Sequence, residues 1–143
     1  MPDELQVLGR AVKQAQYKQH RALDSRLGAA GTTLAQWDAL RAISRAPGAP
    51  ARALAAATFQ SEQAFGTLAG RLAALCLIDR RPGRGRRIEH YLTPSGEEVL
   101  STGHRIADEV LTSCYSPLSP AERTTLLDLL QRIGDGAGAP ADR

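Results

Sequence analysis

The fold is decided by residues 54–92, which read LAAATFQSEQAFGTLAGRLAALCLIDRRPGRGRRIEHYL. The segment opens inside a short Ala-rich helix predicted over residues 50–58, and a brief turn follows it. Ser61 can then cap a further helix predicted over residues 62–77, because a serine hydroxyl accepts hydrogen bonds from the free N–H groups of a first turn. After residue 77 the pattern changes to two short strands around a turn at residues 82–85. This order predicts a helix-turn-helix followed by a β-hairpin.

The helix predicted over residues 62–77 has two different faces. Leu68, Leu72 and Leu75 recur at helical spacing and are expected to hold it to the core. The outward face is then polar, and a polar outward helix after a tight turn is how many proteins present a helix to the major groove of DNA. The side chains expected on that face are Glu62, Gln63, Thr67 and Arg71.

The hairpin is strongly basic. Residues 79–87 carry five arginines and one acidic residue. Such a cluster costs charge repulsion without helping the fold, whereas DNA phosphates and a narrow minor groove would partner each guanidinium. The alternative is a solvated basic loop with no partner. The arginines are Arg80, Arg81, Arg84, Arg86 and Arg87.

Helices are predicted on both sides of this segment. A long first helix ends at residues 28–31, and Thr33 with Gln36 forms a capping box for a second helix that carries Trp37, Leu40 and Ile43. Thr93 and Pro94 open a fifth helix along Val99, Ile106 and Val110, and Ser119, Pro120 and Glu122 open a sixth. The apolar residues along the sixth helix are Leu126, Leu129, Leu130 and Ile133, and those of the first helix are Leu5, Leu8, Val12, Ala15 and Ala22.

These elements predict a mainly α-helical fold with a small β-hairpin wing, in which a winged helix-turn-helix lobe sits in a helical dimerisation frame. We expect one domain over residues 1–143, with the lobe at 32–93, dimerisation helices at 1–30 and 95–134, and a flexible tail at 135–143. The first and sixth helices carry more apolar side chains than one small core can cover, which favours a homodimer.

Several function classes are excluded or disfavoured. The longest apolar run, residues 72–78, is far too short to span a membrane, and the acidic start does not suit a signal peptide, so we expect a cytoplasmic protein. No catalytic motif is present, so an enzyme is not expected. His20, His90 and His104 lack metal-site spacing, and no metal or other cofactor is expected. Cys76 and Cys114 are expected to be buried and reduced.

The chain also resembles a known family. The segments TTLAQWDALRAI at 32–43, LAAAT at 54–58, LAALCLIDR at 72–80 and YLTPSGEEVL at 91–100 look like those of the MarR (multiple antibiotic resistance regulator) winged-helix transcription factors. The resemblance implies a homodimer whose first, fifth and sixth helices interlock. It places the recognition helix on residues 61–77, the wing on 79–92 and the wing-tip arginine at Arg86.

The chain departs from the family pattern at several positions. Arg84 stands where an aspartate usually braces the wing, and Gly66 with Thr67 replaces the common Thr-Arg pair. Gly70 is a second glycine within the recognition helix, which either weakens that helix or permits close backbone approach. Cys76 stands where a glycine usually ends the helix, so this cap must be made without the usual residue.

The resemblance and the charge pattern together predict the contacts. Recognition of DNA is assigned to Gln60, Ser61, Gln63, Thr67, Arg71, Arg80, Arg81, Arg84, Arg86 and Arg87. Family members commonly bind a small aromatic or phenolic acid in a cleft between the dimer frame and the lobe. The residues of suitable chemistry for such an effector are Tyr17, His20, Trp37 and Arg41, although each of them also suits a structural role.

The sequence therefore predicts a sequence-specific regulator of transcription that binds double-stranded DNA as a homodimer, most simply a ligand-responsive repressor on a pseudo-palindromic operator. Two alternatives stay open. One is a winged-helix dimer used for protein interaction, with DNA binding weakened by Gly66 and Gly70. The other is a redox-sensing regulator that uses Cys76 or Cys114.

Overall fold

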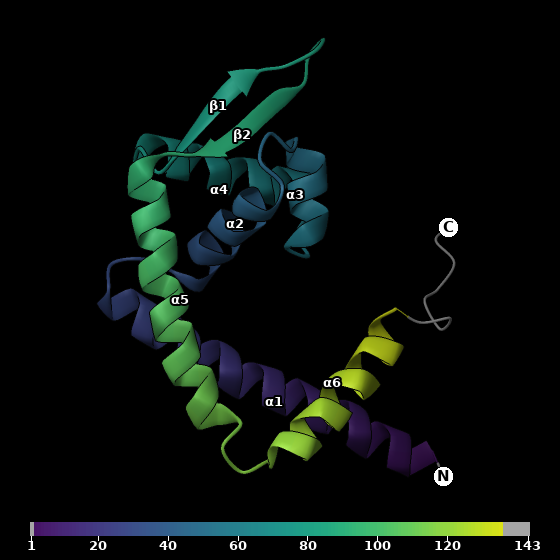
Figure 1. Cartoon of the computed structure of the whole chain (residues 1–143). Coiled ribbons are helices and arrows are strands. Elements are labelled where there is room, and N and C mark those ends of the chain that lie inside the picture. The colour runs from purple at the N-terminus through teal and green to yellow at the C-terminus, as the bar shows by residue number, and fades with distance from the viewer. Residues whose placement is uncertain (1, 136–143) are drawn as a thin grey trace. The chain divides into compact units, whose positions relative to one another are not determined.

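The computed structural model describes residues 2–135 (Figure 1). The chain forms two compact units, one up to Val110 and the other from Leu111 onward. Within the described residues there are six α-helices and one antiparallel two-stranded sheet, so the mainly α-helical fold with a β-hairpin is confirmed. The elements are α1 (Pro2–Ala29), α2 (Leu34–Arg45), α3 (Ala51–Ala57), α4 (Glu62–Ala74), β1 (Ile78–Pro82), β2 (Ile88–Leu92), α5 (Pro94–Cys114) and α6 (Pro120–Gly134).

The first unit has one apolar core built around α2. Trp37, Leu40 and Ile43 are all buried, as the spacing along the second helix predicts. The largest fully buried side chains are Phe65, Leu27, Leu40, Ile43, Leu54 and Leu72, which come from α1, α2, α3 and α4. These helices therefore form one packed body on which the hairpin is mounted.

The junction of α1 and α2 is fixed by polar contacts as well as by packing. Thr33 caps α2, since its side chain accepts a hydrogen bond of 3.0 Å from the Gln36 N–H. The predicted return bond from Gln36 is absent, because the Gln36 side-chain oxygen accepts from the Thr32 hydroxyl instead. Asp24 of α1 accepts from the Leu34 N–H at 2.9 Å, which ties the two helices together.

Helix α4, the predicted recognition helix, differs from the prediction in its end and in its buried face. It stops at Ala74 rather than at residue 77. Phe65, Ala69 and Leu72 are buried, whereas Leu75 is 56% exposed, so the prediction that Leu75 anchors the helix was wrong. The reason is that the helix has already ended when the chain reaches Leu75, and the following residue turns into a left-handed conformation.

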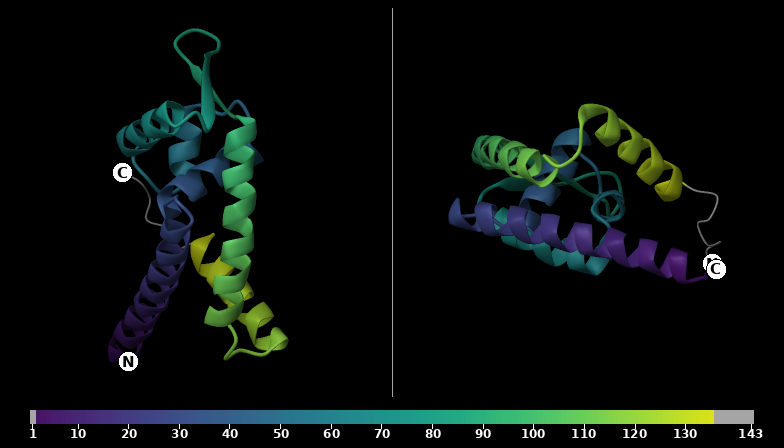
Figure 2. Two further views of the ribbon diagram at one scale, coloured as in Figure 1. Left: turned by 90° about the vertical axis from the view of Figure 1, so that its left-hand side faces the viewer. Right: turned by 90° about the horizontal axis from the view of Figure 1, so that it is seen from below.

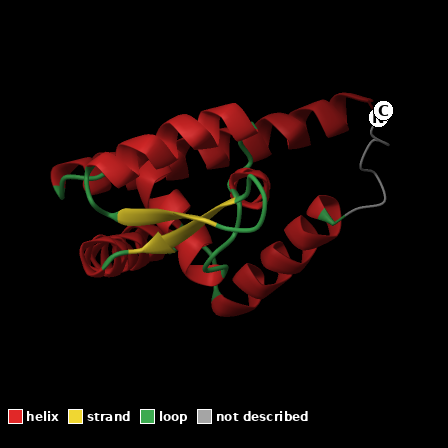
Figure 3. Ribbon diagram, turned by 90° about the horizontal axis from the view of Figure 1, so that it is seen from above, coloured by secondary structure: helices red, strands yellow, loops and turns green. Residues whose placement is uncertain are grey.

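The hairpin pairs in a simple antiparallel register. Ile78 lies opposite Leu92 at the base and Pro82 lies opposite Ile88 near the tip. Gly85, at φ +61°, lies in the connecting loop, where a left-handed backbone favours glycine. The left view of Figure 2 shows the hairpin projecting beyond the helices of the lobe. Figure 3, seen from above, shows the two strands lying in front of these helices.

The start of α5 follows the predicted cap. Thr93 accepts a hydrogen bond of 3.0 Å from the Gly96 N–H, and Pro94 is the first helical residue. Two glycines let this helix pack closely on the lobe. A Cβ added at Gly96 would lie 2.0 Å from the Leu77 carbonyl oxygen, and one added at Gly103 would lie 2.1 Å from the Trp37 ring.

Two apolar faces are left uncovered. Leu5, Leu8 and Val12 of α1 are 45–68% exposed. In the second unit α6 begins with the predicted capping box at Ser119 and Glu122, and none of its residues is buried. Leu129, Leu130 and Ile133 are among its exposed side chains. Most of the predicted tail lies outside the described residues, which end at Asp135, the C-cap of α6.

Candidate nucleic-acid interface

The turn between α3 and α4 uses most of its own polar groups. The Gln60 side-chain amide donates to the Thr58 hydroxyl at 2.9 Å, and Thr58 in turn donates to the Leu54 carbonyl. Ser61 caps α4, with its hydroxyl accepting from the Ala64 N–H at 3.0 Å. Gln60 and Ser61, both assigned to DNA contact from the sequence, thus have a demonstrable role in shaping the turn.

The outward face of α4 is exposed to solvent and carries few long side chains. Gln63, Thr67 and Arg71 are all exposed, but the Thr67 hydroxyl donates back to the Gln63 carbonyl oxygen at 3.2 Å. A Cβ added at Gly66 or Gly70 would meet nothing within 4 Å. Internal packing therefore does not require either glycine, and the long side chains available for contact on this face are Glu62, Gln63 and Arg71.

The wing presents its guanidinium groups to solvent. Arg80, Arg84, Arg86 and Arg87 are exposed, and none makes a side-chain hydrogen bond or salt bridge with the described part of the chain. Their positive charge is therefore uncompensated at close range. Four such groups on one hairpin make a surface suited to phosphate oxygens, which accept charge-assisted hydrogen bonds from arginine.

Arg81 behaves differently from the other wing arginines. Its guanidinium lies 3.6 Å from the Asp79 carboxylate and 4.4 Å from the centre of the Tyr91 ring. Tyr91 donates to the Glu89 carboxylate at 2.8 Å, and this hydrogen bond raises the pKa of the Tyr91 hydroxyl. Asp79, Arg81, Glu89 and Tyr91 therefore form a continuous series of contacts on one face of the hairpin.

His90 joins the hairpin to the lobe. It is 2% exposed, its Nδ1 lies 2.9 Å from the Ala49 carbonyl oxygen, and its ring meets Phe65 of α4 edge to face at 5.9 Å. The Gly48 N–H also donates to the His90 carbonyl oxygen. Sequence reasoning dismissed His90 as an isolated histidine. The alternation of β2 was the available signal, because it places His90 on the same face as Leu92.

The residues predicted to bind an effector do not form one cluster. Trp37 is 3% exposed and donates through Nε1 to the Leu100 carbonyl oxygen at 3.3 Å. Arg41 stacks on it, with the guanidinium carbon 4.5 Å from the ring. Tyr17 and His20 are exposed on α1, where Tyr17 accepts a hydrogen bond from Arg21. Of the four, the geometry brings Trp37 and Arg41 together.

Both cysteines were expected to be buried, and that expectation was wrong. Cys76 and Cys114 are exposed and carry free thiols. Cys76 lies beyond the end of α4, and Cys114 is the last residue of α5, so neither is covered by a packed helix face. No three His, Cys, Asp or Glu side chains gather as a metal site would require within residues 2–135.

Comparison with known proteins matches the winged part of the chain to a family model. Residues 30–88 match the MarR family. This range runs from the residue after α1 to the first residue of β2, and so includes the helix-turn-helix with the arginines of the wing. This part of the chain is a winged helix-turn-helix lobe of the MarR type.

Solved structures share this fold over nearly the whole chain. A MarR mutant from E. coli in complex with operator DNA is 22% identical, with a TM-score of 0.84, and the match covers 92% of this chain and 96% of that chain. A probable transcriptional regulator from Pseudomonas aeruginosa is 29% identical, with a TM-score of 0.79 and coverage of 87% and 95%. A Mycobacterium tuberculosis MarR family protein in complex with p-aminosalicylic acid is 20% identical, with a TM-score of 0.74 and coverage of 89% and 98%. No curated protein matches the sequence.

The departures from the MarR pattern have visible structural consequences. Cys76 adopts φ +62°, the left-handed conformation that glycine favours. Arg84 stands where the MarR pattern usually has an aspartate, and the arginine of the wing that does contact an aspartate is Arg81, which lies beside Asp79 and the Tyr91 ring.

No helix of the described chain has the length and apolar character to cross a membrane.

Proposed function

We propose that this chain is a MarR-family homodimeric repressor that binds a pseudo-palindromic duplex operator and releases it when a small aromatic acid binds. The recognition helix α4 enters the major groove, and the arginine wing lies along the flanking phosphates or in the minor groove. The DNA-binding set is that predicted from the sequence, with Arg81, Gln60 and Ser61 supporting the shape of the surface as well as contacting DNA.

One observation carries this proposal. The exposed face of α4 and the four unpaired arginines of the wing belong to one packed unit, joined through His90 and Phe65. A helix in the major groove and a basic hairpin beside it are the two parts that a winged-helix protein needs. Phosphate contacts of this kind position the protein, while the few side chains on α4 supply base contacts.

The dimer is supported by uncovered apolar surface. Leu5, Leu8 and Val12 of α1 are exposed, as are Leu130 and Ile133 of α6. Monomeric soluble proteins rarely leave such faces open to water, because burying them against a second copy is favourable. Two copies related by a two-fold axis also match an inverted-repeat operator, with half-sites about one helical turn apart.

The effector is supported by one of the structural neighbours. The Mycobacterium tuberculosis relative was solved with p-aminosalicylic acid, which is a small aromatic carboxylic acid. In this chain Arg41 offers a guanidinium beside the Trp37 ring, which is a suitable partner for a carboxylate.

The test is selection of the purified protein against random duplex DNA, followed by titration of the recovered pool at several salt concentrations. We expect an enriched inverted repeat, and an affinity that falls with salt by a slope of about 0.9 for each neutralised phosphate. The double substitution Arg84→Glu with Arg86→Glu should abolish binding to that sequence. Arg105→Glu, which reverses an exposed arginine on α5, is the control and should leave binding intact.

Each result has a clear meaning. Salt-dependent binding without enrichment would remove the sequence-specific part of the proposal. Absence of binding even at low salt would favour the alternative of a protein-interaction dimer. A sedimentation measurement that finds a monomer at micromolar concentration would contradict the dimer.

A further inference from the structure

Thr67 occupies the middle of the outward face of α4. The buried residues of this helix are Phe65, Ala69 and Leu72, which hold it to the lobe. Thr67 stands two residues after Phe65 and two before Ala69, and at about 3.6 residues per turn each of these steps is about half a turn. Its side chain is therefore directed away from the core, and it is exposed. A helix that enters the major groove would turn this side chain towards the base edges.

The hydroxyl group of Thr67 already has a partner. It donates to the Gln63 carbonyl oxygen, one turn earlier in the helix, at 3.2 Å. Threonine within a helix can make this bond, which directs the oxygen back along the helix. The other substituent of the same Cβ is a methyl group, which takes no part in the bond. The hydroxyl proton is therefore engaged within the helix, and the methyl group is left to contact an outside partner.

Two glycines leave the surface beside Thr67 bare. Gly66 precedes it and Gly70 follows it by three residues, and a Cβ at either glycine would meet nothing within 4 Å. The lobe gains no packing from them, and each makes the helix about two- to fivefold less favourable than alanine would. They do narrow the helix, because its backbone alone has a radius of about 2.3 Å, against about 5–6 Å with side chains. The backbone around Thr67 can therefore lie deeper in a major groove than a helix with longer side chains could.

A methyl group that faces the major groove has one natural counterpart among the bases. Thymine carries a C5 methyl group there, and contact between a threonine methyl and this group is an established form of base readout. We infer that Thr67 reads a thymine in each half-site of the operator through its methyl group, and that Gly66 and Gly70 permit the close approach that so short a side chain needs. The inference rests on the proposed function and names one base that α4 selects.

The duplex recovered by selection from random DNA supplies the probe. In each half-site the thymines are replaced one at a time by deoxyuridine, which removes the C5 methyl group and keeps the base pairing. Fluorescence anisotropy at a fixed salt concentration measures the affinity of the intact protein for each duplex. We expect one thymine in each half-site whose replacement weakens binding by about fourfold, the factor that corresponds to the burial of one methyl group.

Two substitutions separate the methyl group of Thr67 from its hydroxyl. Thr67→Ser keeps the hydroxyl and removes the methyl, so it should bind the thymine and deoxyuridine duplexes equally. Thr67→Val keeps a methyl and removes the hydroxyl, so it should still prefer the thymine duplex. Thr124→Ser is the matched control, because Thr124 is an exposed threonine of α6 whose hydroxyl makes the same kind of bond, to the Pro120 carbonyl oxygen at 3.1 Å. It should keep both the affinity and the thymine preference of the unaltered protein.

Gly70→Ala tests the close approach. The added methyl group meets nothing in the lobe, and alanine favours the helix, so folding should not suffer. The preference for thymine over deoxyuridine should nevertheless shrink, because the helix is held farther from the bases. An unchanged preference in this variant would contradict the part of the inference that concerns the glycines.

Three results would overturn the assignment of Thr67. The first is that no thymine of the half-site loses affinity when its methyl group is removed. The second is a deoxyuridine effect of the same size in Thr67→Ser as in the unaltered protein. The third is loss of affinity in Thr67→Val with full affinity in Thr67→Ser, which would assign the base contact to the hydroxyl. In each case the protein still binds the selected inverted repeat, so the proposed function stands, whereas a selection without any enriched sequence would remove the proposed function and this inference together.

Discussion

The hydroxyl of Thr93 donates a hydrogen bond of 2.7 Å to the carbonyl oxygen of Cys76. The same hydroxyl accepts from the Gly96 N–H and so caps α5, while the Thr93 N–H donates to the Leu77 carbonyl oxygen. The end of the recognition helix and the start of α5 are therefore one joint. These bonds tie the first turn of α5 directly to the residues that follow α4.

Gly96→Ala should damage this joint. The new Cβ would lie 2.0 Å from the Leu77 carbonyl oxygen, which belongs to the backbone and cannot rotate away. We expect a loss of about 1–3 kcal/mol in the free energy of unfolding, as is usual for overpacking. Urea denaturation followed by circular dichroism measures it.

Gly66→Ala is the matched control, because it adds the same methyl group to an exposed helical position where nothing lies within 4 Å. It should raise the free energy of unfolding by about 0.5–1 kcal/mol, since alanine is the better helix former. Equal destabilisation by the two substitutions would show that the packing around Gly96 is no closer than that around the exposed Gly66.

Cys76→Gly should stabilise the protein. The Leu77 N–H donates to the Leu72 carbonyl oxygen and the Cys76 N–H to that of Ala73, a pattern that requires a left-handed residue at Cys76. A side chain in that conformation costs about 1–2 kcal/mol, which glycine avoids. Because Cys76 is exposed, the substitution removes little buried surface. Thermal unfolding should show a higher Tm, by several degrees.

Cys76→Ser is the control for this substitution. It keeps a Cβ at the same backbone conformation, so the Tm should stay within about 2 °C of the unaltered protein. A Tm for Cys76→Gly at or below that of Cys76→Ser would mean that the thiol makes interactions that offset the backbone strain.

The starts of the helices could be predicted from the sequence more accurately than the end of α4 at Cys76. The caps at Thr33, Ser61, Thr93 and Ser119 consist of side chains that hydrogen-bond to the backbone, and all four helix starts were predicted correctly. The end of α4 was placed three residues too late because its left-handed residue is a cysteine rather than a glycine. The end of α3 was predicted to within one residue, at 58 rather than Ala57, although the left-handed residue that follows it, Phe59, is not a glycine either.

The wing arginines should divide into two groups in a salt titration of DNA binding. Arg87→Gln removes an unpaired guanidinium, so the slope of log affinity against log salt should fall by about 0.9 for each phosphate that the variant no longer neutralises. Arg81→Gln removes a guanidinium that already lies against Asp79 and Tyr91, so the slope should change less. Fluorescence anisotropy with the selected duplex measures both variants, and equal changes in slope would contradict the division.

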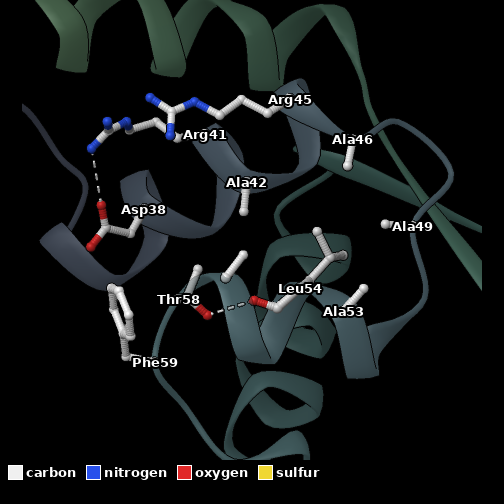
Figure 4. A pocket seen from close by; sticks show the side chains of 11 residues that line it. Asp38, Arg41, Ala42, Arg45, Ala46, Ala49, Ala53, Leu54, Thr58 and Phe59 are labelled. Carbon is white, nitrogen blue, oxygen red and sulfur yellow. Dashed lines mark hydrogen bonds and ion pairs between the residues drawn. The ribbon is translucent and has the colours of Figure 1, made fainter. Parts of the chain in front are cut away.

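This division could not be derived from the sequence. Composition places five arginines in one hairpin, but only the strand register shows that Arg81 and Tyr91 share a face with Asp79 and Glu89. A pocket that α2 and α3 form beside Phe59 (Figure 4) was not predicted from the sequence either. Much of its lining consists of alanines that come from the two helices and the segment between them. Alanine carries no chemical signal in a sequence, and only the packing of α2 against α3 gives these residues a common wall.

The titration of Asp38 should lower the free energy of unfolding as pH rises. Burial raises the pKa of its carboxyl group, and the attraction of Arg41 opposes this effect without cancelling it. The folded state therefore holds the Asp38 proton to a higher pH than the unfolded state does, and stability is lost as pH rises through the interval between the two pKa values. Asp38→Asn is neutral at every pH. The free energy of unfolding of Asp38→Asn minus that of the unaltered protein should therefore increase as pH rises from about 4 towards neutrality.

Urea denaturation at several pH values measures this difference, and comparison with the variant cancels the titration of the other carboxylates. Arg41→Gln provides the matched background, because it removes the hydrogen bond and the nearest of the charges that lower the Asp38 pKa, while His20 and Arg45 remain. In that background the effect of Asp38→Asn should be larger at neutral pH, since burial then acts on the carboxylate without its nearest opposing charge. A difference that decreases with rising pH would instead mean that the attraction of Arg41 outweighs burial, and that folding lowers the Asp38 pKa.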